Sequence, residues 1–114
     1  MFKYKGKQIR VLGIIPSRLN SKRLPKKPLI KINGESLIAR VHRLACQSKI
    51  LDSVIVATDS HLIKDLIDKL NGNSILTSEK HQNGTERMSE VINKINEKYE
   101  IYVLINGDEA LLDP

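Results

Sequence analysis

The chain has 114 residues, of which 40% are hydrophobic and 28% charged, so it is long enough for one domain that folds without a metal or disulfide. Its three Tyr and one Phe are too few for the stacking surfaces of single-stranded nucleic-acid binders, and its single cysteine excludes an intramolecular disulfide and a cysteine-based zinc site. The net charge of +6 is uneven, because residues 1–43 carry 12 basic side chains and one acidic one. This imbalance indicates either simple solubility or an anionic ligand held by the first third.

Segments typical of strands and of helices alternate along the chain. The first strand is predicted over residues 8–15, a β-branched run that ends at Pro16. A polar, basic loop with three prolines follows over 16–28, and the Asn33-Gly34 turn closes a short extended piece over 29–32. Further on, the periodicity predicts three helices. The first covers residues 36–47, the second begins at a cap at Asp59 or Ser60 and continues to residue 70, and the third covers 84–97. Strands are predicted over 53–57, 74–77 and 101–105.

This alternation predicts the α/β class, with a parallel sheet between flanking helices. Ligands of such sheets gather beyond the carboxyl ends of the strands, which are the segments 16–28, 58–59, 78–83 and 106–109 here. We interpret Asp59 as a helix cap rather than as a residue of the site. No apolar run is long enough to span a membrane, and the basic N-terminus lacks the apolar core of a signal peptide, so we expect a cytoplasmic protein.

The loop after the first predicted strand is strongly basic. Backbone N–H groups in such a turn can hold phosphate oxygens, and Arg and Lys neutralise their charge. The glycines and the G-K-[ST] ending of a Walker loop do not occur in it. A phosphate-binding loop and a solvated or nucleic-acid-binding basic loop are both compatible with its residues. They include Ser17, Arg18, Ser21, Lys22, Arg23, Lys26 and Lys27.

Two further loops carry candidate ligand-binding residues. Asp108 and Glu109 follow the last predicted strand, and one such carboxylate can hold Mg²⁺ against phosphates, an ordinary acidic turn being the alternative. Residues 81–87 (HQNGTER) open the third predicted helix. There Thr85 can act as the N-cap, and Arg87 can reach a base or a phosphate.

Four segments together resemble one known family. They are IIPSRLNSKRLPKKPLIKING, VIVATD, TSEKHQNGTERMSEVI and VLINGDEALLDP, and they extend from about Val11 to Pro114. Their order and spacing resemble the 3-deoxy-manno-octulosonate cytidylyltransferases (CMP-Kdo synthetases). The HQ-x-GTER and R-x-x-S-x-RLP-x-KPL strings are the most specific part, since the related CMP-sialate synthetases share the first loop but not HQ-x-GTER.

The resemblance implies a Rossmann-like nucleotidyltransferase fold and transfer of CMP from CTP to 3-deoxy-manno-octulosonate, with release of pyrophosphate and with Mg²⁺ as cofactor. It makes Arg18 and Lys27 the catalytic residues, Lys27 stabilising charge on the α-phosphate and the pyrophosphate. Asp108 matches the family's metal-binding Asp. The residues that the resemblance assigns to nucleotide binding are Arg18, Ser21, Arg23, Lys27, Gln82, Thr85, Arg87 and Asn106.

Three residues depart from the family pattern. Lys26 stands where Gly is usual, Asn106 where Gln is usual, and Ala110 where Pro is usual. A Lys fits poorly at a position that needs a positive φ, and Asn106 is one methylene shorter than Gln. We expect these changes to affect affinity and specificity rather than the fold.

The family's chain is roughly twice as long as this one, against ordinary domains of ~100–200 residues. The expected organisation is therefore a truncated domain, with the nucleotide-binding N-terminal half over 1–114 and the sugar-binding half absent. The expected partners are CTP and the acidic sugar or an analogue, with a homodimer or a complementing C-terminal half. A non-catalytic nucleotide-binding remnant and half of a split enzyme are alternatives, and a basic nucleic-acid-binding domain is a more distant one.

Overall fold

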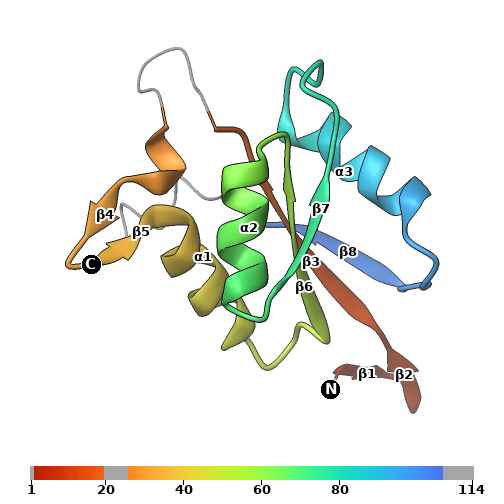
Figure 1. The fold of residues 1–114 in the computed structure, drawn as a ribbon. Helices are drawn as coiled ribbons and strands as arrows, with labels where there is room; N and C mark the ends of the chain where they lie inside the picture. Colours follow the sequence, from red (N-terminus) through yellow and green to blue (C-terminus); the bar gives the residue numbers. More distant parts are fainter. Residues whose placement is uncertain (1, 20–25, 107–114) are drawn as a thin grey trace.

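The computed structural model of the chain describes residues 2–19 and 26–106, in which helices flank a parallel sheet (Figure 1). No helix in this described part is long and apolar enough to cross a membrane. The elements in chain order are β1 (Phe2–Tyr4), β2 (Lys7–Ile9), β3 (Val11–Ser17), the 3₁₀ helix η1 (Lys27–Leu29), β4 (Lys31–Ile32), β5 (Glu35–Ser36), α1 (Leu37–Cys46), β6 (Ser53–Thr58), α2 (His61–Lys69), β7 (Asn73–Leu76), α3 (Gly84–Lys94) and β8 (Ile101–Leu104).

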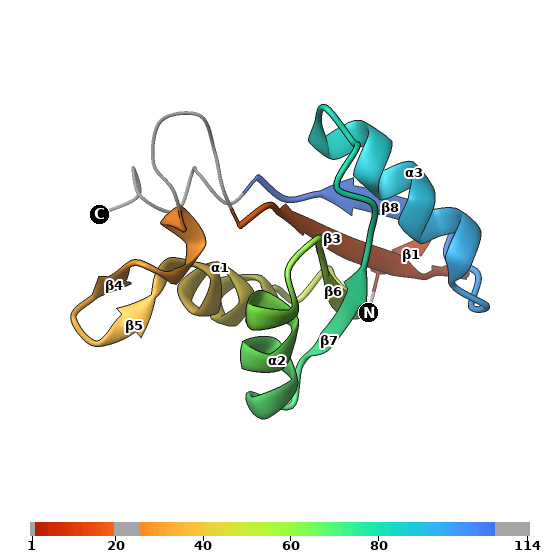
Figure 2. The same cartoon turned by 45° about the horizontal axis from the view of Figure 1, so that its top comes forward.

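Four parallel strands form the main sheet in the order β7–β6–β3–β8, so β3 lies between β6 and β8. Gly13 of β3 stands opposite Val54 on one side and Val103 on the other. Helices α1 and α2 lie on one face of the sheet and α3 lies on the other (Figures 1 and 2). The predicted α/β fold with a parallel sheet is therefore confirmed.

Alternate side chains of the central strands enter two separate cores. Ile15 and Val56 point toward α1 and α2, whereas Ile14 and Ala57 point toward α3 and contact the core around Val91. All five are fully or almost fully buried, which places the strongest apolar packing around the two middle strands. Loop segments at the carboxyl ends of these strands are thereby held on a rigid base.

Each helix begins at a polar side chain that accepts hydrogen bonds from the first turn. Ser36, Ser60 and Asn83 take this position in α1, α2 and α3. The expectation that Thr85 caps the third helix is therefore wrong, because Asn83 has extended backbone and Thr85 already lies in the first turn. The interpretation of Asp59 as a cap is also wrong, because Ser60 caps α2.

The first predicted strand differs from the observed structure at both ends. It divides at Arg10 into β2 and β3, and β2 pairs with β1 in an antiparallel hairpin that the pattern did not predict. Pro16 continues the strand, opposite Ala57 of β6. The N–H of Ile105 donates to the carbonyl of Ile14, so the backbone groups of Ile14 face β8. Pro16 is two residues further along, so its nitrogen also faces the β8 side, but it lies beyond the last residue pair of β3 and β8. Its missing N–H therefore removes no ladder hydrogen bond.

Two other predicted features can be compared with the structure: the Asn33-Gly34 turn is confirmed, and α3 is shorter than predicted. Asn33 and Gly34 both have positive φ and connect β4 to β5, as the Asn-Gly signal predicts. Helix α3 ends at Lys94 rather than at residue 97, because Ile95 has extended backbone.

Candidate functional site

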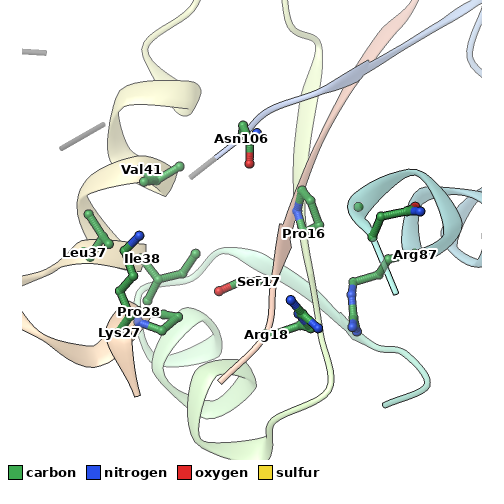
Figure 3. Close-up of a pocket in the computed structure, with 12 residues that line it drawn as sticks. Pro16, Ser17, Arg18, Lys27, Pro28, Leu37, Ile38, Val41, Arg87 and Asn106 are labelled. Atoms are coloured by element: carbon green, nitrogen blue, oxygen red, sulfur yellow. The ribbon is translucent and has the colours of Figure 1, made fainter. Parts of the chain in front are cut away.

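A cavity of about 210 Å³ lies at the carboxyl end of β3, between α1 and the start of α3 (Figure 3). This is the sheet edge at which parallel α/β proteins bind ligands. One wall is apolar and comes mainly from α1, whereas the opposite side is polar and cationic. The lining residues are Pro16, Ser17, Arg18, Lys27, Pro28, Leu37, Ile38, Val41, Asn83, Gly84, Arg87 and Asn106.

Four of the residues predicted for the site line this cavity. Arg18 follows β3, Lys27 begins η1, Arg87 lies on α3, and Asn106 follows β8. Figure 3 shows the guanidinium groups of Arg18 and Arg87 lying close together, with Lys27 on the side of α1. Three cationic side chains around one small cavity create a positive potential that attracts an anionic ligand.

The other predicted residues fall outside the cavity wall or outside the described residues. Gln82 and Thr85 are exposed and are not among the lining residues. The backbone N–H of Gln82 instead donates to Glu86 Oε1 at 2.6 Å, which fixes the loop at the start of α3. Ser21, Arg23 and Asp108 lie outside the described residues.

Arg87 is a charged side chain with only 1% of its surface exposed. Its Nη1 donates to Thr77 Oγ1, while its Nη2 has no hydrogen-bond partner among the described residues and lies 4.0 Å from Asp59 Oδ2. Burial lowers the pKa of Arg87, Asp59 opposes that change, and Arg18 lowers the pKa further. An unsatisfied buried donor costs about 1–3 kcal/mol, so the placement of Nη2 marks Arg87 as a candidate binding residue.

Asp59 is a residue of this region that the sequence interpretation missed. Its Oδ1 accepts a hydrogen bond from the N–H of Leu19 at 3.2 Å, and its Oδ2 faces Arg87. The carboxylate therefore connects the segment after β3 to α3 and partly neutralises the buried guanidinium. Its position directly after β6, at the carboxyl edge of the sheet, is the signal that could have identified it.

Glu90 holds the loop that leads into α3. Its Oε1 accepts from the N–H of Ser78 at 2.9 Å and lies 2.6 Å from His81 Nε2, and its Oε2 lies 2.5 Å from Lys94 Nζ. The hydrogen bond from Lys94, which has the largest effect, and the one from the Ser78 N–H lower the pKa of Glu90 to about 2. Because this loop ends at Asn83, which lines the cavity, Glu90 orders one side of the site.

Lys26 occupies a backbone conformation that favours glycine. Its φ is 58° and its ψ is 26°, directly before η1. The family pattern has Gly at this position, and the structure gives the reason, since a residue with a Cβ is strained there. Lys26 therefore stores strain next to Lys27, which lines the cavity.

The fold and the cavity define a Rossmann-like α/β protein with a cavity lined by cationic side chains at the carboxyl edge of its sheet. The family model described as cytidylyltransferase matches residues 12–114, so the chain belongs to the cytidylyltransferase family of nucleotidyltransferases. This confirms the resemblance drawn from the motifs.

Curated relatives carry the same family name. The chain is 47% identical over 102 residues to the 3-deoxy-manno-octulosonate cytidylyltransferase of Chlamydia pneumoniae. The aligned segment covers 90% of this chain and 40% of that protein. It is 42% identical over 105 residues to the enzyme of the same name from Leptospira interrogans, covering 92% of this chain and 42% of that protein. The chain thus spans about 40% of the length of these relatives.

A solved structure shares the fold. It is a CMP:2-keto-3-deoxy-manno-octonic acid synthetase complexed with CTP, with a TM-score of 0.80 and 35% sequence identity over 86% of this chain and 40% of that chain. The 4-diphosphocytidyl-2C-methyl-D-erythritol synthase of Anaerococcus prevotii has a TM-score of 0.62 at 18% identity, over 91% of this chain and 48% of that chain, and it supports the fold alone.

Proposed function

We propose that this chain binds CTP in the cavity and is the nucleotide-binding part of an enzyme that transfers CMP to 3-deoxy-manno-octulosonate. The observation that carries the proposal is the buried Arg87, whose Nη2 has no hydrogen-bond partner among the described residues and which lines the cavity with Arg18 and Lys27. A solved structure with the same fold is described as complexed with CTP. The cavity of about 210 Å³ is smaller than the ~300–1,000 Å³ of complete ligand pockets, in keeping with part of a larger site.

The proposed reaction is an in-line phosphoryl substitution. The anomeric hydroxyl oxygen of the sugar attacks the α-phosphorus of CTP, the bond from that phosphorus to the bridging oxygen breaks, and pyrophosphate leaves with the electron pair while the hydroxyl proton is released. Lys27 and Arg18 neutralise the charge that develops on the α-phosphate and the leaving pyrophosphate. Arg87 donates to an acceptor on the nucleotide, and the Asn106 amide supplies a further hydrogen bond.

Mg²⁺ is part of this proposal through Asp108. Residues 2–19 and 26–106 contain no group of three or more His, Cys, Asp or Glu side chains that could hold a metal, and Asp108 lies outside them. A carboxylate is the ligand type that Mg²⁺ takes beside phosphates, and Asp108 stands two positions after the cavity-lining Asn106. When bound there, Mg²⁺ would neutralise phosphate charge.

The matched relatives are more than twice as long as this chain, since the aligned 102 residues are 40% of one relative and the aligned 105 residues are 42% of another. We propose that a complementing C-terminal half carries the sugar-binding part. CMP-activated octulosonate is a lipopolysaccharide precursor, and the single cysteine suits a reducing compartment, so we propose that the reaction takes place in the cytoplasm.

Calorimetric titration with CTP, ATP and GTP in the presence of Mg²⁺ tests the proposal. We expect CTP to bind more tightly than ATP and GTP, and Lys27→Ala to weaken CTP binding at least ~10-fold, because it removes a charge-assisted contact. Lys69→Ala, in the last turn of α2 and exposed, is the matched control that should leave the affinity unchanged. Equal affinity for the three nucleotides, or unchanged CTP binding in Lys27→Ala, would contradict the proposal.

A further inference from the structure

Asp59 contacts two parts of the cavity without lining it. The residue follows β6 directly, and its side chain is 16% exposed. Its Oδ1 accepts a hydrogen bond from the N–H of Leu19 at 3.2 Å, one residue after the cavity-lining Arg18. Its Oδ2 lies 4.0 Å from Nη2 of Arg87, which also lines the cavity. The carboxylate can therefore act on a ligand through its neighbours, without touching it.

The guanidinium of Arg87 is held from two sides at the end of β6. Its Nη1 donates to Thr77 Oγ1, and the N–H of Thr77 donates to the carbonyl of Thr58, the last residue of β6, at 2.8 Å. Asp59 approaches from β6 as well, because it is the next residue in the chain. A separation of 4.0 Å makes an ion pair but is too long for a hydrogen bond. Asp59 thus attracts Nη2 and leaves its hydrogen-bonding capacity for another acceptor.

A negative charge is needed at this point because two cations converge there. Figure 3 shows the guanidinium groups of Arg18 and Arg87 close together. Burial lowers the pKa of Arg87 most; after burial, Asp59 raises it, Arg18 lowers it, and Glu90 raises it least. Like charges repel more strongly where water is excluded. The Asp59 carboxylate therefore offsets a repulsion that would otherwise turn Arg87 away from Arg18.

We infer that Asp59 is a positioning residue of the nucleotide site: it keeps Nη2 of Arg87 at the cavity beside Arg18 and joins the chain after β3 to the same point. The inference rests on the proposed function and deepens it, because it gives a role in nucleotide binding to a residue that need not contact the nucleotide. A helix cap does not account for Asp59, since Ser60 caps α2. The remaining alternative is a buried ion pair that contributes only to stability.

Asp59→Asn separates positioning from charge. The amide oxygen can still accept from the N–H of Leu19, but the negative charge is lost. Charge alone predicts tighter binding, because the cavity becomes more positive and CTP is anionic. Loss of positioning predicts the opposite, and we expect calorimetric titration with CTP and Mg²⁺ to show at least ~5-fold weaker binding. Asp65→Asn, at an exposed residue of α2 outside the cavity wall, makes the same change of charge and should leave the affinity unchanged.

Two further measurements show whether Asp59 acts through Arg87. In a double-mutant cycle, Asp59→Asn should change CTP affinity less than ~2-fold in the Arg87→Met background, whereas a role independent of Arg87 would leave the two effects additive. NMR of the wild-type chain without ligand should show separate Nη1 and Nη2 signals for Arg87, because a guanidinium held on both sides rotates slowly. Exchange between these signals should be faster in Asp59→Asn. The wild-type signals test the inference even if Asp59→Asn does not fold.

Unchanged or tighter CTP binding in Asp59→Asn, an equal loss in the Arg87→Met background, or one averaged Nη signal for wild-type Arg87 would overturn the inference. Failure of the wild-type chain to bind CTP refutes the proposed function instead. The Arg87 signals then decide whether Asp59 positions the guanidinium. Separate wild-type signals that exchange faster in Asp59→Asn support that role, and signals that the substitution leaves unchanged refute it.

Discussion

Replacing Arg87 by Met tests two separate quantities, the contribution of Arg87 to the free energy of unfolding and its contribution to nucleotide affinity. The substitution removes the hydrogen bond from Nη1 to Thr77 Oγ1, a bond to a charged group worth about 1.5–3 kcal/mol. It also removes Nη2, a buried donor without a partner among the described residues, whose burial costs about 1–3 kcal/mol. The two effects oppose each other. The substitution also leaves the largely buried Asp59 carboxylate without its cationic neighbour, so we expect a net loss of about 1–3 kcal/mol in the free energy of unfolding.

The same substitution should strongly reduce nucleotide affinity. In the proposed complex Nη2 donates to a buried acceptor of CTP, and loss of one such charge-assisted bond costs about 1.5–3 kcal/mol, or ~10- to 150-fold in Kd. Calorimetric titration with CTP and Mg²⁺ measures the affinity, and urea unfolding measures the stability of the same preparation.

Val91→Ala is the matched control one helical turn further along α3. Val91 is fully buried beside Leu12, Ile14 and Ala57, and truncation removes two carbons worth about 1.6 kcal/mol of transfer free energy plus a cavity cost. We expect a loss of roughly 2–3 kcal/mol in stability with CTP affinity of the folded protein unchanged. The reasoning is refuted if Arg87→Met loses as much stability as Val91→Ala while its CTP affinity stays at the wild-type value.

Two further substitutions test strain and charge near the cavity, and a third tests the packing of Gly72 against His42 and Ile67. Lys26→Gly relieves a φ of 58° and should raise the free energy of unfolding by ~0.5–1 kcal/mol in urea titrations, whereas a loss would show that contacts of the Lys side chain outweigh the strain. Glu90, with its pKa lowered to about 2, stabilises the fold above pH ~4.3 and loses that effect as the pH falls toward 2. Stability measured from pH 6 to pH 2 should therefore fall less steeply in Glu90→Gln, and parallel curves would count against this role. Gly72→Ala should cost roughly 1–3 kcal/mol in thermal unfolding, because its Cβ would lie 2.6 Å from His42 Nε2 and 2.8 Å from Ile67 Cγ2; unchanged stability would mean that both side chains move at no cost.

Much of the fold is predictable because its elements follow simple periodicities. The apolar spacing of α1 and α2 and the β-branched runs of β3 and β6 predict the elements and their order. The hairpin of β1 and β2 is different, because its strands have only three residues each and are joined by a turn with positive φ at Lys5 and Gly6. The end of the first strand was wrongly predicted at Pro16. A proline can continue β3 there because the pairing with β8 has already ended, and only the register of the pairing shows this.

The site is partly predictable for a related reason. The carboxyl ends of parallel strands share one edge, so Arg18 and Asn106 meet there although they are far apart in the chain. The burial of Arg87 and its approach to Asp59 do not follow from the pattern, because charged side chains are rarely buried and the packing of α3 decides this one. Gln82 and Thr85 belong to the same motif as Arg87, yet Gln82 lies in the loop before α3, Thr85 lies in its first turn, and both are exposed.

The order of the sheet has a consequence for how the protein is made. β3 precedes β6 and β8 in the chain, yet it lies between them in the sheet and pairs with both. Its buried residues 11–15 therefore remain without their final neighbours while the segment up to residue 104 is translated. A cavity that needs both Arg18 and Asn106 cannot close before that point. Until β8 is translated, β3 therefore keeps one of its two edges unpaired even after β6 has joined the other.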